Sequence, residues 1–140
     1  MRKKMILAVA ALVLLAVATI VLVWNYVNYL DYLREIVHET ERWAVIEDLN
    51  GHHIAVEPTS DDVWNQLVRL NENGTSMWIG GIVEEYSNKW GFRFKPETLA
   101  VAEVTAEGLQ ATIQYISENL DYWLDLGWAY VDAKVTDIHQ

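Results

Sequence analysis

The chain opens with a long, uninterrupted hydrophobic stretch. After a basic tail at residues 1–4, no charged residue occurs before Asp31, and Thr19 is the only polar side chain within residues 5–23. A helix rises about 1.5 Å per residue, so roughly twenty residues cross the hydrocarbon core of a bilayer. This pattern predicts a transmembrane helix over residues 5–23, with the lipid bilayer as its partner.

The residues on either side of this stretch indicate its orientation. Basic residues flanking a membrane helix stay in the cytoplasm. Aromatic residues suited to the headgroup region follow the stretch, at Trp24, Tyr26 and Tyr29. We therefore expect a single-pass plasma-membrane protein with cytoplasmic residues 1–4 and an extracytoplasmic domain at 43–140. A cleaved signal peptide is the alternative, because Ala16-Val17-Ala18 resembles a cleavage site. The hydrophobic run is, however, longer than the roughly 7–15 residues of a signal core.

The helix is expected to continue beyond the membrane, over residues 24–42. Apolar or small residues recur there at alternating spacings of three and four, as in the seam of a coiled coil. The seam consists of Val23, Tyr26, Leu30, Leu33, Val37, Thr40 and Ala44. One hypothesis is a parallel homodimer held together by this juxtamembrane helix. The other is a helix that packs its stripe on its own domain, which the short seam favours.

A hairpin and a helix are predicted at the start of the domain. Asn50-Gly51 separates two short apolar runs, and this dipeptide favours the turn of a β-hairpin. Pro58 ends the second strand. Residues 59–62 (Thr-Ser-Asp-Asp) supply caps for a helix whose apolar face includes Trp64, and Asn73-Gly74 ends it.

Three strands, a second helix and a last strand are predicted in the remainder. The strands span Met77–Tyr86, Trp90–Phe94 and Leu99–Val104, the helix runs from Ala106 to Asp125 with Thr105 as its cap, and the last strand covers Trp128–Val135. Gly80-Gly81 indicates a bulge or a close approach of two backbones. The predicted order is β-β-α-β-β-β-α-β, an α+β fold whose antiparallel sheet carries both helices on one face.

Charge narrows the class of partner. Seven basic residues follow the N-terminal tail, against all twenty acidic residues of the chain, a net charge of −13. Nucleic acid is excluded as a partner because phosphate binding needs a basic surface. A charge of this sign favours cationic partners or a salty medium. The chain has no Cys, which excludes disulfides and thiolate chemistry.

Part of the domain resembles a small known family. The segment Trp90-Gly-Phe-Arg-Phe-Lys-Pro, Val101-Ala-Glu-Val and the helical Gln114-Tyr115-Ile116 carry the likeness, which covers about Met77 to Asp125. The family was named from the N-terminal domain of a protist calmodulin-binding protein and has prokaryotic members of unknown role. The resemblance implies no activity. Calmodulin is not expected as a partner, because its targets are basic helices and residues 106–125 contain no Lys or Arg.

Catalytic and metal-binding chemistry is weakly represented. His52 and His53 are adjacent on a strand and point to opposite faces, so no metal site is expected. Glu84 and Glu103 lie in neighbouring predicted strands and could pair for acid–base work in a small hydrolase, the least favoured hypothesis. No nucleotide, calcium-loop or serine-hydrolase motif occurs, so we expect neither a cofactor nor an enzyme.

Two surface features give positive expectations. Asn73-Gly74-Thr75 is a glycosylation sequon on a predicted loop, provided the domain lies outside the cell. The aromatics of the second half exceed what so small a core accommodates: Trp78, Trp90, Tyr122, Trp123, Trp128 and Tyr130. Some are expected to form an exposed binding patch, with Arg93 nearby. The alternative is that they complete the core or lie against the lipid headgroups. The leading hypothesis is a membrane-anchored binding module for an unknown protein or small ligand. A structural protein that dimerises is the first alternative.

Overall fold

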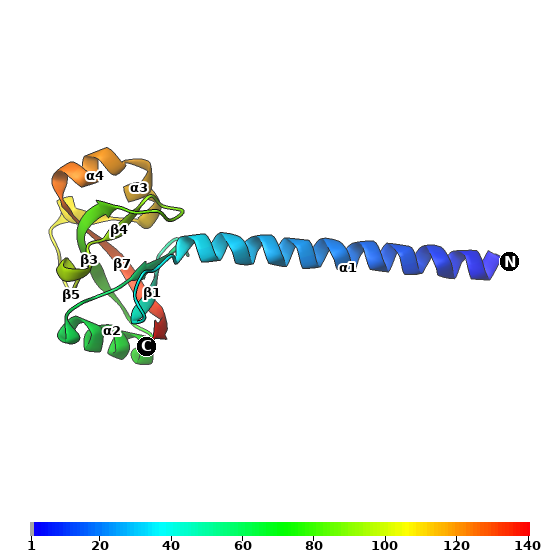
Figure 1. Ribbon diagram of the computed structural model, residues 1–140, viewed down its shortest axis with the longest axis horizontal. Coiled ribbons are helices and arrows are strands. Elements are labelled where there is room, and N and C mark those ends of the chain that lie inside the picture. Colours follow the sequence, from blue (N-terminus) through cyan, green and yellow to red (C-terminus); the bar gives the residue numbers. More distant parts are fainter. Residues whose placement is uncertain (1) are drawn as a thin grey trace. The chain divides into compact units, whose positions relative to one another are not determined.

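A computed structural model describes residues 2–140 of the chain (Figure 1). It divides into two units, residues 2–33 and Arg34–Gln140. Helix α1 (Arg2–Glu35) makes up the first unit and contributes its last two residues to the second. Within residues 2–140, α1 is the one helix long and apolar enough to cross a membrane. This finding is consistent with a single-pass anchor.

The expected juxtamembrane helix is shorter than predicted. Residues 24–35 are helical, whereas residues 36–42 are not, so the prediction of helix over 24–42 is wrong from Ile36 onward. The physical reason is tertiary. The backbone N–H groups of Glu39 and Thr40 donate to the carboxylate of Glu57, at 2.6 and 2.7 Å, instead of continuing the helix. The coiled-coil seam therefore loses Val37, Thr40 and Ala44, which leaves the dimer hypothesis fewer than two heptads.

The second unit is built on one sheet, and the predicted α+β class is confirmed. Its strands are β1 (Trp43–Asp48), β2 (His53–Val56), β3 (Ser76–Glu85), β4 (Phe92–Phe94), β5 (Ala100–Ala102), β6 (Gln110–Ala111) and β7 (Trp128–His139). The main path is β2-β1-β7-β3-β4; β5 also pairs with β3, and β6 pairs with β7. All pairings are antiparallel except the two-residue pairing of β6 with β7, which is parallel and was not predicted.

The local signals at the start of the domain are confirmed. Gly51 has φ +79° in the turn between β1 and β2. Helix α2 (Asp61–Asn73) begins at Ser60, whose hydroxyl accepts from the Val63 N–H, and Gly74 ends it in the left-handed conformation. These caps satisfy backbone groups that the helix leaves unpaired at its ends.

The second predicted helix is wrong in its first third. Residues 107–109 form a single 3₁₀ turn, η2 (Glu107–Leu109), and β6 follows. Thr112, not Thr105, caps helix α3 (Ile113–Glu118), accepting from the Tyr115 N–H at 3.2 Å. A break at Asn119 separates α3 from α4 (Leu120–Leu126). The helical spacing of apolar residues therefore corresponds to a helix only from residue 113 onward.

One hydrophobic core lies between the helices and the inner face of the sheet. Alternate residues of β7 belong to it: Ala129, Val131, Ala133 and Val135. Trp64, Leu67 and Leu70 reach it from α2, and Ile113, Ile116 and Trp123 from α3 and α4. Figure 1 shows α2 beside one end of the sheet and α3 and α4 beside the other. The opposite, outer face carries the remaining residues of β3 and β7.

The C-terminal strand is longer than predicted and ends in a ring stack. β7 continues past Val135 to His139, which pairs with Trp43. The Trp43 ring is sandwiched between His38 and His139, with ring centroids 3.9 Å apart on both sides and interplanar angles of 17° and 11°. This stack joins the segment after α1 to the end of the central strand.

Candidate functional site

Three of the predicted aromatic residues share the outer face of β3 and β7. Trp78 pairs with Asp132, and Gly80 pairs with Tyr130. Because residues directly opposite in an antiparallel pair share a face, Trp78, Trp128 and Tyr130 all lie outward. Trp128 stacks on Tyr130, with ring centroids 6.2 Å apart at an interplanar angle of 12°, and remains 37% exposed. The structure therefore brings three members of the predicted patch together.

Trp90 does not belong to this patch. It is 7% exposed, and its indole Nε1–H donates to the backbone carbonyl of His53 at 2.7 Å. That bond links the loop before β4 to β2, at the opposite edge of the main strand order. The prediction of Trp90 as an exposed binding residue is wrong, because its ring completes the core. Trp123 is also buried, whereas Tyr122 is exposed on α4.

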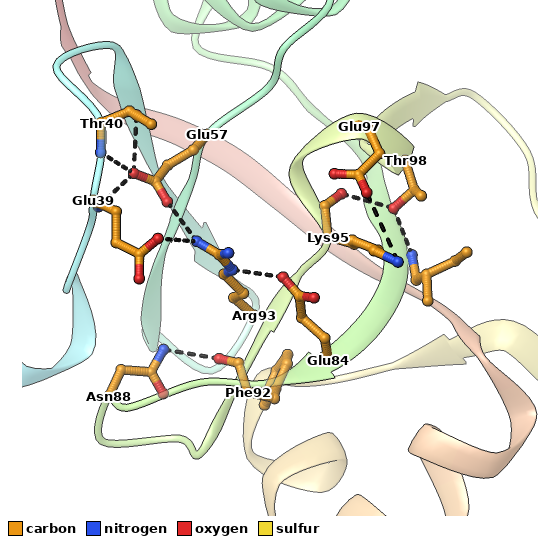
Figure 2. Close-up of polar contacts among 11 residues, drawn as sticks. Glu39, Thr40, Glu57, Glu84, Asn88, Phe92, Arg93, Lys95, Glu97 and Thr98 are labelled. Atoms are coloured by element: carbon orange, nitrogen blue, oxygen red, sulfur yellow. Dashed lines mark hydrogen bonds and ion pairs between the residues drawn. The ribbon is translucent and has the colours of Figure 1, made fainter.

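Arg93 is the centre of an acidic cluster (Figure 2). Its Nε donates to Glu84 at 2.7 Å, and its Nη1 donates to Glu57 at 3.1 Å and to Glu39 at 3.4 Å. Glu57 is buried, and its other oxygen accepts from the segment after α1. Arg93 thus joins β4 to the residue after β2, and its charge is balanced within the domain. Arg93 therefore has a structural role, and its predicted role in binding stays a prediction.

Tyr86 lies against this cluster. The Arg93 guanidinium carbon is 4.4 Å from the centroid of the Tyr86 ring, a cation–π contact. Burial, then the charges of Glu57 and Glu39, raise the pKa of the Tyr86 hydroxyl. Burial acts to lower the pKa of Arg93, but the hydrogen bond and charge of Glu84, with the charge of Glu39, raise it above its ordinary value. Arg93 is therefore held in its charged form.

The proposed pair of catalytic carboxylates is not assembled. Glu84 lies opposite Arg93 on β4, and Ala102, the residue before Glu103, lies opposite Trp78. Trp78 and Glu84 are about 20 Å apart along β3, at roughly 3.3 Å per residue. Glu103 is exposed, and Glu84 is bound to Arg93. The register of the strands therefore separates the two acids, and the hydrolase hypothesis loses its site.

A groove opens beside the aromatic face. β1 ends where Asp48 pairs with Ala133, and β6, on the same side of β7, ends where Ala111 pairs with Val131. Asp132 is thus the residue of β7 at which the neighbouring strand changes. A cavity of about 400 Å³ lies at this break, and Leu49, Trp78, Tyr115 and Asp132 are among the residues that line it. Leu49 and Tyr115 are 74% and 51% exposed.

Asp48 fixes two walls of this groove. One carboxylate oxygen accepts from the N–H groups of Asn50 and His52, at 3.0 and 3.1 Å, and the other accepts from the Ile113 N–H at 3.0 Å. The first two bonds shape the turn that presents Leu49, and the third holds the start of α3. The buried carboxylate of Asp48 is therefore fully engaged and acts as a positioning group.

The remaining predicted residues lie elsewhere on the domain. Asn73 is exposed at the end of α2, so its glycosylation stays a prediction. His53 contacts Glu35 and Glu47, whereas His52 lies against Trp90. Among residues 2–140, no group of three or more His, Cys, Asp or Glu side chains is placed to hold a metal ion.

Comparison with known proteins adds no relative. No family model, curated protein or solved structure matches the chain. The resemblance of residues 77–125 to the family named from a calmodulin-binding protein therefore stays an expectation.

Sequence reasoning missed the groove. Leu49, Tyr115 and Asp132 were not predicted as site residues, because they come from a hairpin turn, a helix and a strand that only the fold brings together. The signal that could have indicated Asp132 is its place in the alternating run Trp128, Tyr130, Asp132, which puts it on the face of the aromatic residues.

Proposed function

We propose that the chain is a single-pass membrane protein whose extracytoplasmic domain binds a partner through the outer face of β3 and β7. The observation that carries the proposal is the grouping of Trp78, Trp128 and Tyr130 on a sheet face beside a groove. Aromatic side chains of this kind dominate the energetics of binding surfaces. Helix α1 supports the membrane part, since its apolar stretch is long enough to span a bilayer.

Other uses of the chain have less support. The hydrolase hypothesis lacks its pair of acids in contact, since Glu84 lies near one end of β3 and Glu103 follows β5, which pairs with the other half of β3. Dimerisation through the juxtamembrane helix has only Val23, Tyr26, Leu30 and Leu33 left as a seam. A binding role needs no group beyond those already on the outer face.

The topology is testable by labelling, because the chain has no native Cys. In intact cells, we expect a membrane-impermeant maleimide to label a Glu72→Cys variant, at an exposed position of α2, and not a Lys3→Cys variant. After lysis, both variants should react. The labelled protein should also keep its full-length mass and stay in the membrane pellet at alkaline pH. The reverse labelling pattern would overturn the orientation, and loss of the N-terminal residues would indicate a cleaved signal.

The binding surface is testable by cross-linking in cells. A photoreactive benzoylphenylalanine replaces Trp128 in one variant and Gln66, exposed on α2, in the control. We expect irradiation to give a discrete adduct from position 128 and none from position 66, because only the first lies on the proposed face. Equal adducts from both positions, or none from position 128, would contradict the proposed surface.

A further inference from the structure

The groove at the break between β1 and β6 contains a carboxylate without a partner. Among the residues that the structure describes, 2–140, the half-buried side chain of Asp132 makes no hydrogen bond and no ion pair. The other acid in the wall, Asp48, uses both of its oxygens within the fold. A carboxylate in an otherwise apolar groove loses solvation, and a bound cation restores that interaction.

No basic residue of the domain supplies this cation. Lys134, two residues further along β7, has its Nζ 3.2 Å from Glu47. Of the seven basic residues after the N-terminal tail, five are in ion pairs with acids: Arg42, Lys89, Arg93, Lys95 and Lys134. The domain thus has an acidic excess, and Asp132 is one of the acidic residues that line this groove. Charge complementarity points to a cationic ligand.

Aromatic rings accompany the carboxylate. Trp78 is the direct cross-strand neighbour of Asp132 on the outer face, and Tyr115 of α3 lines the same cavity. The faces of Trp and Tyr attract ammonium and guanidinium groups, and their apolar surface also packs against a methylene chain. The combination of two aromatic rings and one free carboxylate suits a group with an apolar stem and a positively charged end.

We infer that this groove binds a lysine or arginine side chain of an extracytoplasmic polypeptide, with the cationic end at Asp132 and the stem along Trp78 and Tyr115. This inference rests on the proposed function and names its ligand class. A peptide is favoured over a small amine because the groove continues. A second cavity of about 350 Å³ shares Asp48, Leu49 and Asp132 with the first and extends past Gly51 and Ser76. The residues flanking the basic side chain would lie along this extension.

The test uses the full chain in maltoside micelles, whose uncharged headgroups offer no competing charge. Its Trp residues are replaced by 5-fluorotryptophan, and a Trp78→Phe variant assigns the Trp78 fluorine resonance. The probes are Nα-acetyl-lysine N-methylamide and its neutral analogue Nα-acetyl-norleucine N-methylamide. We expect the lysine probe to shift the Trp78 resonance saturably, with a dissociation constant on the order of 1 mM for a ligand of this size. The neutral analogue should bind at least tenfold more weakly.

Two variants locate the charge. Asp132→Asn should weaken binding of the lysine probe at least tenfold, whereas Asp121→Asn, which removes the same charge from an exposed position of α4, should leave it unchanged. Unshifted resonances of the buried Trp90 and Trp123 show that each variant is folded. The lysine probe should also bind more weakly at high salt.

The outcomes separate the two claims. Equal binding of both probes at Trp78 would overturn the cationic ligand but leave the groove as a binding surface. Unchanged lysine binding in Asp132→Asn would overturn the role of that carboxylate. No shift of Trp78 with either probe would overturn the inference, and cross-linking at position 128 then decides independently whether the proposed face binds a partner.

Discussion

Replacing Glu57 with glutamine should lower the free energy of unfolding by about 3 kcal/mol, because it breaks a buried ion pair from one side. The Glu57 side chain is 3% exposed, and one oxygen accepts three hydrogen bonds from Glu39 and Thr40. The other oxygen accepts from Arg93 at 3.1 Å. An amide cannot accept at both ends, so the variant sets an NH₂ group against either the guanidinium or the backbone donors.

Glu39→Gln is the matched control. Glu39 contacts the same Arg93 atom at 3.4 Å, but its side chain is 65% exposed. Exposed ion pairs contribute about 0–1 kcal/mol to stability, so the free energy of unfolding of this variant should fall by no more than that amount. The measurement is urea unfolding of the protein in maltoside, followed by tryptophan fluorescence. Equal destabilisation by the two substitutions would show that burial of Glu57 does not matter, contrary to this account.

A Gly80→Ala substitution should destabilise the domain by about 3 kcal/mol or more, the upper end of the effect of overpacking. A methyl group at position 80 would lie 2.0 Å from the carbonyl oxygen of Ala129 and 2.7 Å from Cα of Tyr130. Both are backbone atoms of β7, the central strand, so no side chain can turn aside to make room. β3 and β7 would have to separate locally, which also displaces the aromatic face.

The control is Gly108→Ala in the exposed 3₁₀ turn η2. A methyl group there has no neighbour within 4 Å, and surface substitutions of this kind change stability by about 0.5 kcal/mol or less. The same unfolding measurement applies, and amide hydrogen exchange should show lost protection in β3 and β7 of the Gly80→Ala variant only. Wild-type stability of Gly80→Ala would mean that the backbones of β3 and β7 leave room for a methyl group at position 80.

The parts of the fold set by local chemistry could be predicted from the sequence. The turn at Asn50-Gly51 depends on a residue that accepts positive φ, and α2 depends on Ser60 and Gly74 at its ends. The alternation of Phe92, Arg93 and Phe94 along β4 likewise puts the two rings in the core and the guanidinium on the opposite face of the strand. Each of these signals is contained within a few neighbouring residues.

The parts set by distant contacts could not be predicted. α1 ends at Glu35 because the backbone N–H groups of Glu39 and Thr40, which would have continued the helix, donate to Glu57, some twenty residues later. The first residues of the expected second helix form the 3₁₀ turn η2 and then β6, which pairs with β7, a strand about twenty residues later in the chain. The distance between Glu84 and Glu103 depends on how β3 is aligned with β4 and β5, and the sequence of a single strand does not contain that alignment.

The candidate site divides in the same way. Trp128 and Tyr130 could be placed on one face by alternation along β7, whereas the position of Trp78 on that face depends on the register between β3 and β7. Burial of Trp90 could not be foreseen, since it depends on the carbonyl of His53 from the other edge of the main strand order. Asp132 could not be recognised as a site residue, because it lies between the positions on β7 where the pairings with β1 and with β6 end.

The pairing of Trp43 with His139 has a mechanical consequence. β1 and β7 are antiparallel, so the residues before Trp43 and the C-terminal Gln140 leave the sheet at the same end. A pull between them acts along the interstrand hydrogen bonds, which lie perpendicular to the strands, and breaks the ladder one pair at a time. The His38–Trp43–His139 stack lies at this end of the ladder, and it shares the load with the hydrogen bonds from Glu39 and Thr40 to Glu57. Tension applied through the C-terminus would therefore unzip the domain, whereas a ligand held at Asp132 would pull on the middle of the central strand.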